Sequence, residues 1–225
     1  MYSNSVNYRN TSSNMVLRST YALLAVTLLP TILGAWLGMQ IPFELYAAHR
    51  LAWFLGSLVA MFGVLFLTHL NKDNPMGVFF CLLFTAIMGF LLGPTLQFTL
   101  HLHNGVMILS QAIGLTAFAL LATSLYVTMS KRDFSAMGGF LFASLWVIIG
   151  AGILNMFFHS ALLYVLISAF AVIIFVAYLM YDISKVVNGG ETNYVIATLN
   201  IYLDLMNLFV NLLQLLIALQ GGDRD

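Results

Sequence analysis

The chain has 225 residues, of which 61% are hydrophobic and 7% are charged, and its mean hydropathy is +0.97. A soluble globular domain carries about a quarter charged residues, so this composition excludes one and predicts a protein of the lipid bilayer. Eight basic residues balance eight acidic ones, which removes the electrostatic case for binding nucleic acid. The single cysteine, Cys81, excludes disulfides within the chain and metal sites built from several thiolates.

Seven apolar runs are long enough to cross the hydrocarbon, which takes about 20 mostly apolar residues per helix. The break between the fifth and sixth runs rests on Phe158-His159-Ser160, because the 45 residues from Ala136 to Met180 are too many for one span. We expect an all-α polytopic membrane protein with a polar tail at 1–20, a seven-helix transmembrane domain at 21–219 and a short tail at 220–225. The runs lie at roughly 21–39, 50–70, 76–93, 106–129, 136–158, 160–181 and 194–219.

The basic residues divide unequally between the two sides of the membrane. Loops rich in Lys and Arg stay in the cytoplasm. Six basic residues on one side and two on the other predict a cytoplasmic N-terminus and, with seven spans, a C-terminus outside. The six are Arg9, Arg18, Lys72, Lys131, Arg132 and Lys185, and the two are Arg50 and Arg224.

Two glycine pairs have the spacing that lets membrane helices approach closely. They are Gly34-x-x-x-Gly38 in the first run and Gly89-x-x-x-Gly93 in the third. The motif is unspecific, because glycine is common in polytopic proteins.

A polar stripe runs along the seventh span. Its five residues follow one another at spacings of 4, 3, 4 and 3, which places them within an arc of about 80° on a helix. Such side chains would cost kilocalories each if they faced lipid. We therefore predict that this helix faces inward and is the central one, with the amides either supporting an ion path or simply bonding helix to helix. The stripe consists of Asn200, Asp204, Asn207, Asn211 and Gln214.

Asp204 is the strongest functional candidate in the chain. It lies about ten residues into the last span, and ionisable residues at that depth are usually functional. Asp182 ends the preceding span, and the chain reverses between the two at Gly189-Gly190. Counting helical rise leaves about 9 Å between their depths, so spacing alone does not predict contact.

The remaining motifs do not favour catalysis. His101-x-His103 is a weak metal signal without neighbouring Cys, Asp or Glu. Zinc hydrolases with seven spans need several histidines that converge with a carboxylate, and no span here holds two at helical spacing. Ser/His/Asp, P-loop and dinucleotide-binding patterns are also missing. We expect no catalytic residues and a protein that is not an enzyme.

Three motifs in the last two spans resemble those of the Bax inhibitor motif family. They are YDIS at 181–184, NGGETNY at 188–194 and IYLDLMNLF at 201–209. The GGETNY stretch is most similar to the bacterial YccA-type branch, so the expected location is a bacterial inner membrane. The resemblance implies a seven-helix fold with the last helix at the centre.

The family resemblance also implies a function and its residues. Members act as pH-sensitive calcium leaks in which paired carboxylates of the last two helices form the gate and the ion site. Asp182 and Asp204 match them here and would ligate Ca²⁺ in transit, without a permanently bound cofactor. Those members place an arginine at the cytoplasmic end of the second span to latch one aspartate. Asn71 and Lys72 occupy that stretch, so Lys72 is the candidate latch, as a point charge without the forked geometry of Arg.

The resemblance leaves two functions open. The first is a pH-sensitive calcium leak channel. The alternative is a non-conducting modulator of a membrane-bound ATP-dependent protease, which would be a partner besides the lipid bilayer. For that function the polar tail at 1–20 would be the handle, and its low hydrophobicity is typical of a disordered segment.

The charge distribution predicts the topology. A reporter fused after Asp225 should be periplasmic, and one inserted between Ser130 and Ser135 should be cytoplasmic. Paired alkaline phosphatase and fluorescent protein fusions measure both positions. A cytoplasmic reporter at the C-terminus would indicate an even number of spans and would contradict the prediction.

Overall fold

The computed structural model describes residues 2–221, with the side chains of residues 13–42, 44–46, 48–49 and 51–221. The regular structure in this part of the chain is helical, and seven of its helices are long and apolar enough to cross a membrane. The prediction of an all-α membrane protein with seven spans is confirmed. The spans are Ser13–Met39, Leu51–Leu70, Pro75–Leu100, Gly105–Ser130, Ser135–Phe158, Ala161–Val187 and Tyr194–Gln220.

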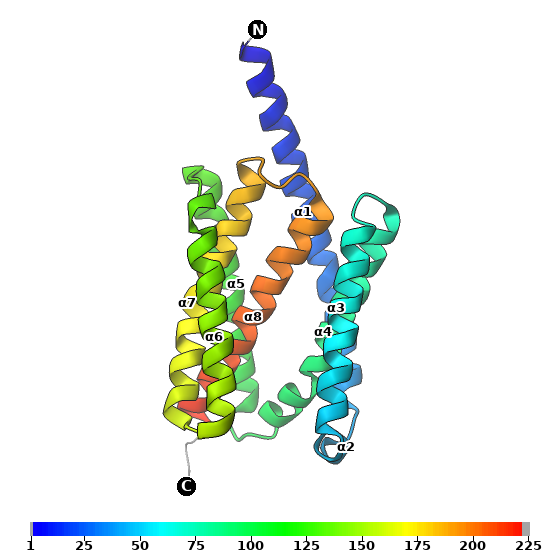
Figure 1. The fold of residues 1–225 in the computed structure, drawn as a ribbon, viewed down its shortest axis with the longest axis vertical. Helices are drawn as coiled ribbons and strands as arrows, with labels where there is room; N and C mark the ends of the chain where they lie inside the picture. The colour runs from blue at the N-terminus through cyan, green and yellow to red at the C-terminus, as the bar shows by residue number, and fades with distance from the viewer. Residues whose placement is uncertain (1, 222–225) are drawn as a thin grey trace. The chain divides into compact units, whose positions relative to one another are not determined.

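The helices form two compact units. The first unit contains residues 15–101 and 193–199, and the second contains residues 102–192, the rest of α8 and the first turns of α1. In chain order the elements are α1 (Tyr2–Met39), α2 (Phe43–Ala48), α3 (Arg50–Leu70), α4 (Pro75–Leu100), α5 (Gly105–Ser130), the 3₁₀ turn η1 (Ser135–Met137), α6 (Gly138–Phe158), α7 (Ala161–Val187) and α8 (Tyr194–Gln220) (Figure 1).

Helix α1 is longer than the first predicted span. It begins at Tyr2, and the span within it begins at Ser13, so the polar residues expected to form a disordered tail are helical from residue 2 on. Extending a helix that already exists adds one hydrogen bond per residue without the cost of nucleation. The apolar span therefore allows a polar segment that is a poor helix former by itself to continue the same helix.

In the first unit, α1 and α4 approach each other through their glycines. A Cβ added to Gly34 would collide with the carbonyl group of Ala86, and one added to Gly93 would collide with the backbone of Gly38. Gly89 likewise faces the backbone of α1. The two glycine pairs, unspecific as sequence motifs, thus pack against each other, and α3 packs on another side of α4.

Two features of the first unit differ from the expected spans. Helix α4 continues through Pro94 to Leu100, beyond the predicted end at residue 93, as membrane helices tolerate an internal proline. The short helix α2, which precedes α3, was not predicted. The Tyr46 hydroxyl of α2 donates a hydrogen bond to the Gly38 carbonyl oxygen at 3.0 Å, and partial burial raises the pKa of this phenol.

In the second unit, α7 packs against both α5 and α6. The predicted break between α6 and α7 is confirmed, with His159 in the left-handed region at φ 50°. Ser160 then caps α7, because its Oγ accepts a hydrogen bond from the Leu163 N–H at 3.2 Å. Side chains in the core of this unit that are wholly buried include Ile108, Leu141, Leu179, Ile183 and Leu208.

Helix α8 has the largest buried share of the seven spans. Large apolar side chains on other spans are exposed, for example Phe118 and Trp146, as expected of surfaces that face lipid. The burial of α8 agrees with the expectation that the polar stripe turns this helix inward.

The contact between α1 and α4 predicts that Gly89→Ala destabilises the protein. The added Cβ would meet the backbone of α1, and overpacking of this kind costs about 1–3 kcal/mol. The melting temperature in detergent, followed by size-exclusion chromatography, should fall. Gly63→Ala is the matched control, because a Cβ at Gly63 meets nothing within 4 Å. Equal melting temperatures for the two variants would contradict the close packing.

Candidate functional site

The connection between α7 and α8 is a tight, hydrogen-bonded reversal. Gly189 adopts a φ of 73°, which favours glycine, and the N–H groups of Gly190 and Glu191 both donate to the Lys185 carbonyl oxygen at 2.7 and 3.0 Å. These bonds satisfy the end of α7 and turn the chain back. The reversal predicted from Gly189-Gly190 is therefore confirmed.

Asn193, at the end of the GGETNY motif, starts α8. Its Oδ1 accepts hydrogen bonds from the N–H groups of Val195 and Ile196 at 3.0 and 3.1 Å. Its Nδ2 donates to the Lys72 carbonyl oxygen at 3.0 Å and to Asp73 Oδ1 at 2.9 Å. The Asn193 side chain thus caps α8 and bonds its first turn to the loop between α3 and α4. These contacts explain structurally why the motif contains an asparagine at this position.

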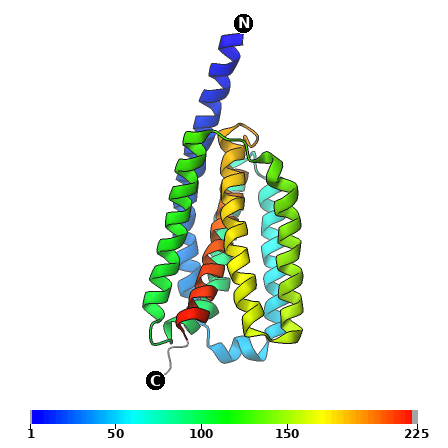
Figure 2. The same cartoon turned by 90° about the vertical axis from the view of Figure 1, so that its left-hand side faces the viewer.

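Asp182 and Asp204 lie together in the second unit. The two carboxyl groups are close enough to act on each other directly, although counting along the chain left them at different depths. The reason is visible in Figure 1, where α8 is inclined to α7, so rise along the helix overstates the separation in depth. Figure 2 shows the two helices side by side from another direction.

The pair is largely removed from solvent. Asp204 is 6% exposed, and the side chain of Asp182 is 12% exposed. Asp204 Oδ2 is buried and accepts no hydrogen bond from the part of the chain that the structure describes. Since a buried carboxylate oxygen without a partner is costly, this atom is where a cation, a proton or a water molecule would bind most favourably.

Charged and aromatic groups of the second unit surround Asp182. Lys185 Nζ lies 3.9 Å from Asp182 Oδ1, one turn further along α7, and 5.2 Å from the centre of the Tyr181 ring. Glu191 interacts electrostatically with Asp182, and Tyr178 interacts with both carboxylates. The site therefore combines two acidic groups with one cation on the same helix as Asp182.

The structure pairs Asp182 with Lys185, which the sequence analysis did not assign to the site. The signal was present, because Asp and Lys three residues apart on a helix face each other. Lys72, the latch suggested by the resemblance, lies in the loop between α3 and α4, where its carbonyl oxygen accepts the bond from Asn193.

The rest of the polar stripe behaves differently from Asp204. Asn207 Nδ2 donates to the Leu203 carbonyl oxygen at 2.8 Å, and Asn211 Nδ2 donates to the Asn207 carbonyl oxygen at 2.8 Å. Both amides thus bond the backbone of their own helix. Asn200 and Gln214, the ends of the stripe, are partly exposed.

Ser184 of α7 and Asn188, the residue that follows this helix, hold the loop between α5 and η1. The Ser184 hydroxyl donates to the Arg132 carbonyl oxygen at 3.1 Å and accepts from the Phe134 N–H at 3.0 Å, and Asn188 Nδ2 donates to the same carbonyl oxygen at 3.2 Å. In that loop the Ser135 N–H donates to Asp133 Oδ1 at 2.8 Å and lowers the pKa of this exposed carboxyl. These contacts of Ser184 and Asn188 were not predicted from the sequence, because they join residues about 50 positions apart.

The acidic groups of the site are the two carboxyl groups of Asp182 and Asp204. Among the described residues, no three or more His, Cys, Asp or Glu side chains gather as a metal cluster. A cation at the pair would therefore have two carboxylates as its acidic ligands. His101 lies apart in the sequence, at the end of α4, and its Nδ1 contacts the Gln97 carbonyl oxygen at 2.7 Å.

Comparison with known proteins gives one result over nearly the whole chain. A family described as "Inhibitor of apoptosis-promoting Bax1" matches residues 13–221. A membrane protein of Vibrio cholerae is 36% identical over 216 residues, which is 96% of this chain and 94% of the relative. Proteins from two strains of Escherichia coli, named "Modulator of FtsH protease YccA" and "Inner membrane protein YccA", are 33% identical over 91% of this chain and 90% of their own length. The chain therefore belongs to the Bax inhibitor family, as the motifs of its last two spans predicted.

Proposed function

We propose that this chain is a non-catalytic protein of the bacterial inner membrane that modulates a membrane-bound ATP-dependent protease of the FtsH kind. The observation that carries the proposal is its similarity, over nine-tenths of both chains, to a protein named as a modulator of that protease.

Helix α1 is the element best suited to contact the protease. Residues 2–12 precede the span and continue it as one helix, which adds about 16 Å to the helix at 1.5 Å per residue. Their sequence is polar, with Arg9 as the one charged residue. A helix that crosses the membrane and extends on the predicted cytoplasmic side can interact with a membrane protein and with its cytoplasmic part at the same time.

The carboxylate pair supports a second function, a proton-sensitive cation leak. Asp182 and Asp204 offer oxygen ligands suited to a hard cation such as Ca²⁺, which would be the transported ion. The buried Oδ2 of Asp204, which lacks a partner among the described residues, favours this function over a purely structural pair.

The pH response would follow from the protons that the pair holds. A hydrogen bond between two carboxyl groups requires a proton on one of them. When the pH falls, further protonation removes the negative charge that holds Lys185 beside Asp182, so the contacts that close the site weaken. Flux should then rise as the pH is lowered, with Glu191 and Tyr178 as the other titratable groups that act on the pair.

The modulator proposal predicts that deleting residues 2–12 abolishes the effect on the protease. This deletion leaves the span from Ser13 intact, so insertion and ion flux should be retained while protease contacts are lost. The measurement is the half-life of a tagged membrane substrate of FtsH in cells that overproduce the variant.

A variant with residues 2–12 in scrambled order is the matched control, because it keeps length and polarity. If the deletion variant changes substrate turnover as much as the native chain does, residues 2–12 do not contact the protease. If the scrambled variant changes substrate turnover as the native chain does and the deletion variant does not, the segment acts as a spacer of fixed length.

The leak proposal predicts that Asp204→Asn lowers calcium flux and flattens its pH dependence. The change keeps the size and hydrogen bonding of the side chain but removes a charged ligand and a titrating group. If the interaction of the cation with the site weakens by about 1.4 kcal/mol, flux falls about tenfold. Liposomes that contain the protein and a calcium dye, compared at pH 8 and pH 6, measure both effects.

Asp133→Asn is the matched control, since it removes an exposed carboxylate from a loop. Lys185→Met and Lys72→Ala show which lysine is the latch. The variant that removes the cation holding Asp182 should raise flux at pH 8, and the other should not. Unchanged flux and an unchanged pH profile in Asp204→Asn would contradict the leak and leave the pair a structural one.

A further inference from the structure

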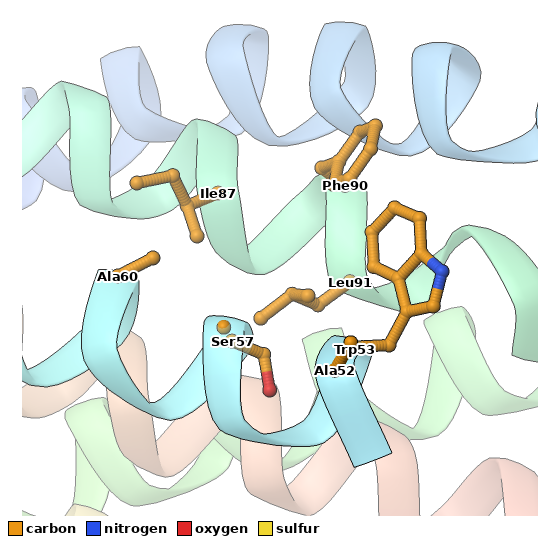
Figure 3. Close-up of a pocket in the computed structure, with 8 residues that line it drawn as sticks. Ala52, Trp53, Ser57, Ala60, Ile87, Phe90 and Leu91 are labelled. Atoms are coloured by element: carbon orange, nitrogen blue, oxygen red, sulfur yellow. The ribbon is translucent and has the colours of Figure 1, made fainter. Parts of the chain in front are cut away.

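A groove opens between α3 and α4 in the first unit (Figure 3). Its volume is about 470 Å³, within the range that ligand sites occupy. Small residues of α3 form one side, and larger apolar side chains form the rest. The lining residues are Ala52, Trp53, Gly56, Ser57, Ala60, Ile87, Phe90 and Leu91.

The groove offers almost nothing to water. Its one side-chain hydroxyl, that of Ser57, already donates to the Phe54 carbonyl oxygen at 2.8 Å. Ordered water in an apolar space needs two to four polar partners, so the groove favours an apolar occupant. A Cβ at Gly56 would meet nothing within 4 Å, which shows that this side of the groove is open.

The length of the groove matches one leaflet of a bilayer. From Ala52 to Ala60 a helix rises about 12 Å, and half of the hydrocarbon thickness is about 15 Å. Trp53 is the third residue of the span Leu51–Leu70, so the groove begins near the interface and ends near the midplane. A lipid acyl chain covers that distance, whereas a transmembrane helix would continue through the second leaflet.

The walls suit a single chain rather than a helix. The Trp53 ring lies 6.0 Å from the Phe90 ring and 4.7 Å from the Tyr46 ring, and Figure 3 shows the indole between α3 and α4. An α-helix with its side chains is about 10 Å across and would have to displace this aromatic wall. An acyl chain can lie along it.

The interfacial end of the groove adjoins a second hollow. This hollow is lined by Ala48, His49, Leu51, Ala52 and Leu55, shares Ala52 with the groove and adds the polar ring of His49. The headgroup of a lipid whose acyl chain lay in the groove would therefore be at the polar, His49 end of α3.

We propose that the groove between α3 and α4 binds one acyl chain of a phospholipid, with the headgroup at the His49 end of α3. The site lies within the first unit and does not depend on the carboxylate pair or on the protease. It assigns a structural lipid to the leaflet at the His49 end of α3.

The test uses Trp53 as the reporter in detergent-solubilised full-length protein. A variant with Trp36→Phe and Trp146→Phe leaves Trp53 as the one tryptophan, and a phospholipid with brominated acyl chains is titrated as the quencher. Quenching should saturate at about one lipid per chain and be reversed by the unbrominated phospholipid. Trp36 and Trp146 are 56% and 60% exposed, so single-tryptophan variants that keep one of them should show quenching that rises without saturation.

Gly56→Leu should raise the half-saturating lipid concentration. The leucine side chain would take the place of about two methylene groups of the acyl chain, which corresponds to a change of about tenfold. Gly63→Leu is the matched control on the same helix, because Gly63 also has open space at its Cβ but does not line the groove.

Three results would overturn the proposal. Trp53 quenching that never saturates would mean that the groove holds only transient lipid. Equal half-saturating lipid concentrations for Gly56→Leu and Gly63→Leu would mean that the lipid does not bind in the groove. The third result combines two observations. If Trp53 is poorly quenched and a Gly56→Cys, Cys81→Ser variant forms disulfide-linked dimers, the groove is occupied by a second copy of this chain.

Discussion

The need to satisfy every polar group inside the hydrocarbon constrains this molecule more than any other interaction. No water is available there to hydrogen-bond a stray hydroxyl or amide. The buried hydroxyls of Thr20, Thr27 and Thr68 accordingly donate to backbone carbonyl oxygens of their own helices. Asn207 and Asn211 do the same in α8. Three buried side-chain oxygens lack a hydrogen-bond partner among the described residues, those of Gln97, Gln111 and Asp204. Asp204 is the one of the three that can carry a charge, so its missing partner is the most costly.

The hairpin of α7 and α8 shows how one short segment combines structural and chemical tasks. Lys185 supplies the carbonyl oxygen that closes the turn and the ammonium group that pairs with Asp182. Ser184, its neighbour, holds the loop that leads into η1. A change in charge at Asp182 therefore acts on a turn of α7 that is also fixed by backbone and loop contacts. Such coupling provides a physical route from protonation to a movement of the loop, without a longer pathway.

The sequence predicted what depends on periodicity and composition, and it failed where contacts depend on helix inclination. The seven spans, the break at His159 and the burial of α8 follow from apolar runs and the polar stripe. The contact between Asp182 and Asp204 did not follow, because rise counting assumes parallel helices of equal depth. The helix at residues 2–12 was missed because its stability comes from the span it extends and not from its own residues.

The two proposed functions depend on different parts of the chain, and this separates them physically. Protease modulation requires a surface, and the part best placed for it is α1, whose contacts with α4 are made through glycines and do not involve the carboxylates. A cation leak requires Asp182 and Asp204, which belong to the second unit. A protein that only occupied a protease would gain nothing from a buried carboxylate pair, because apolar residues of similar size would pack there at lower cost. The buried pair is therefore the feature that protease modulation alone does not explain, and it is the reason why the second function is proposed beside the first.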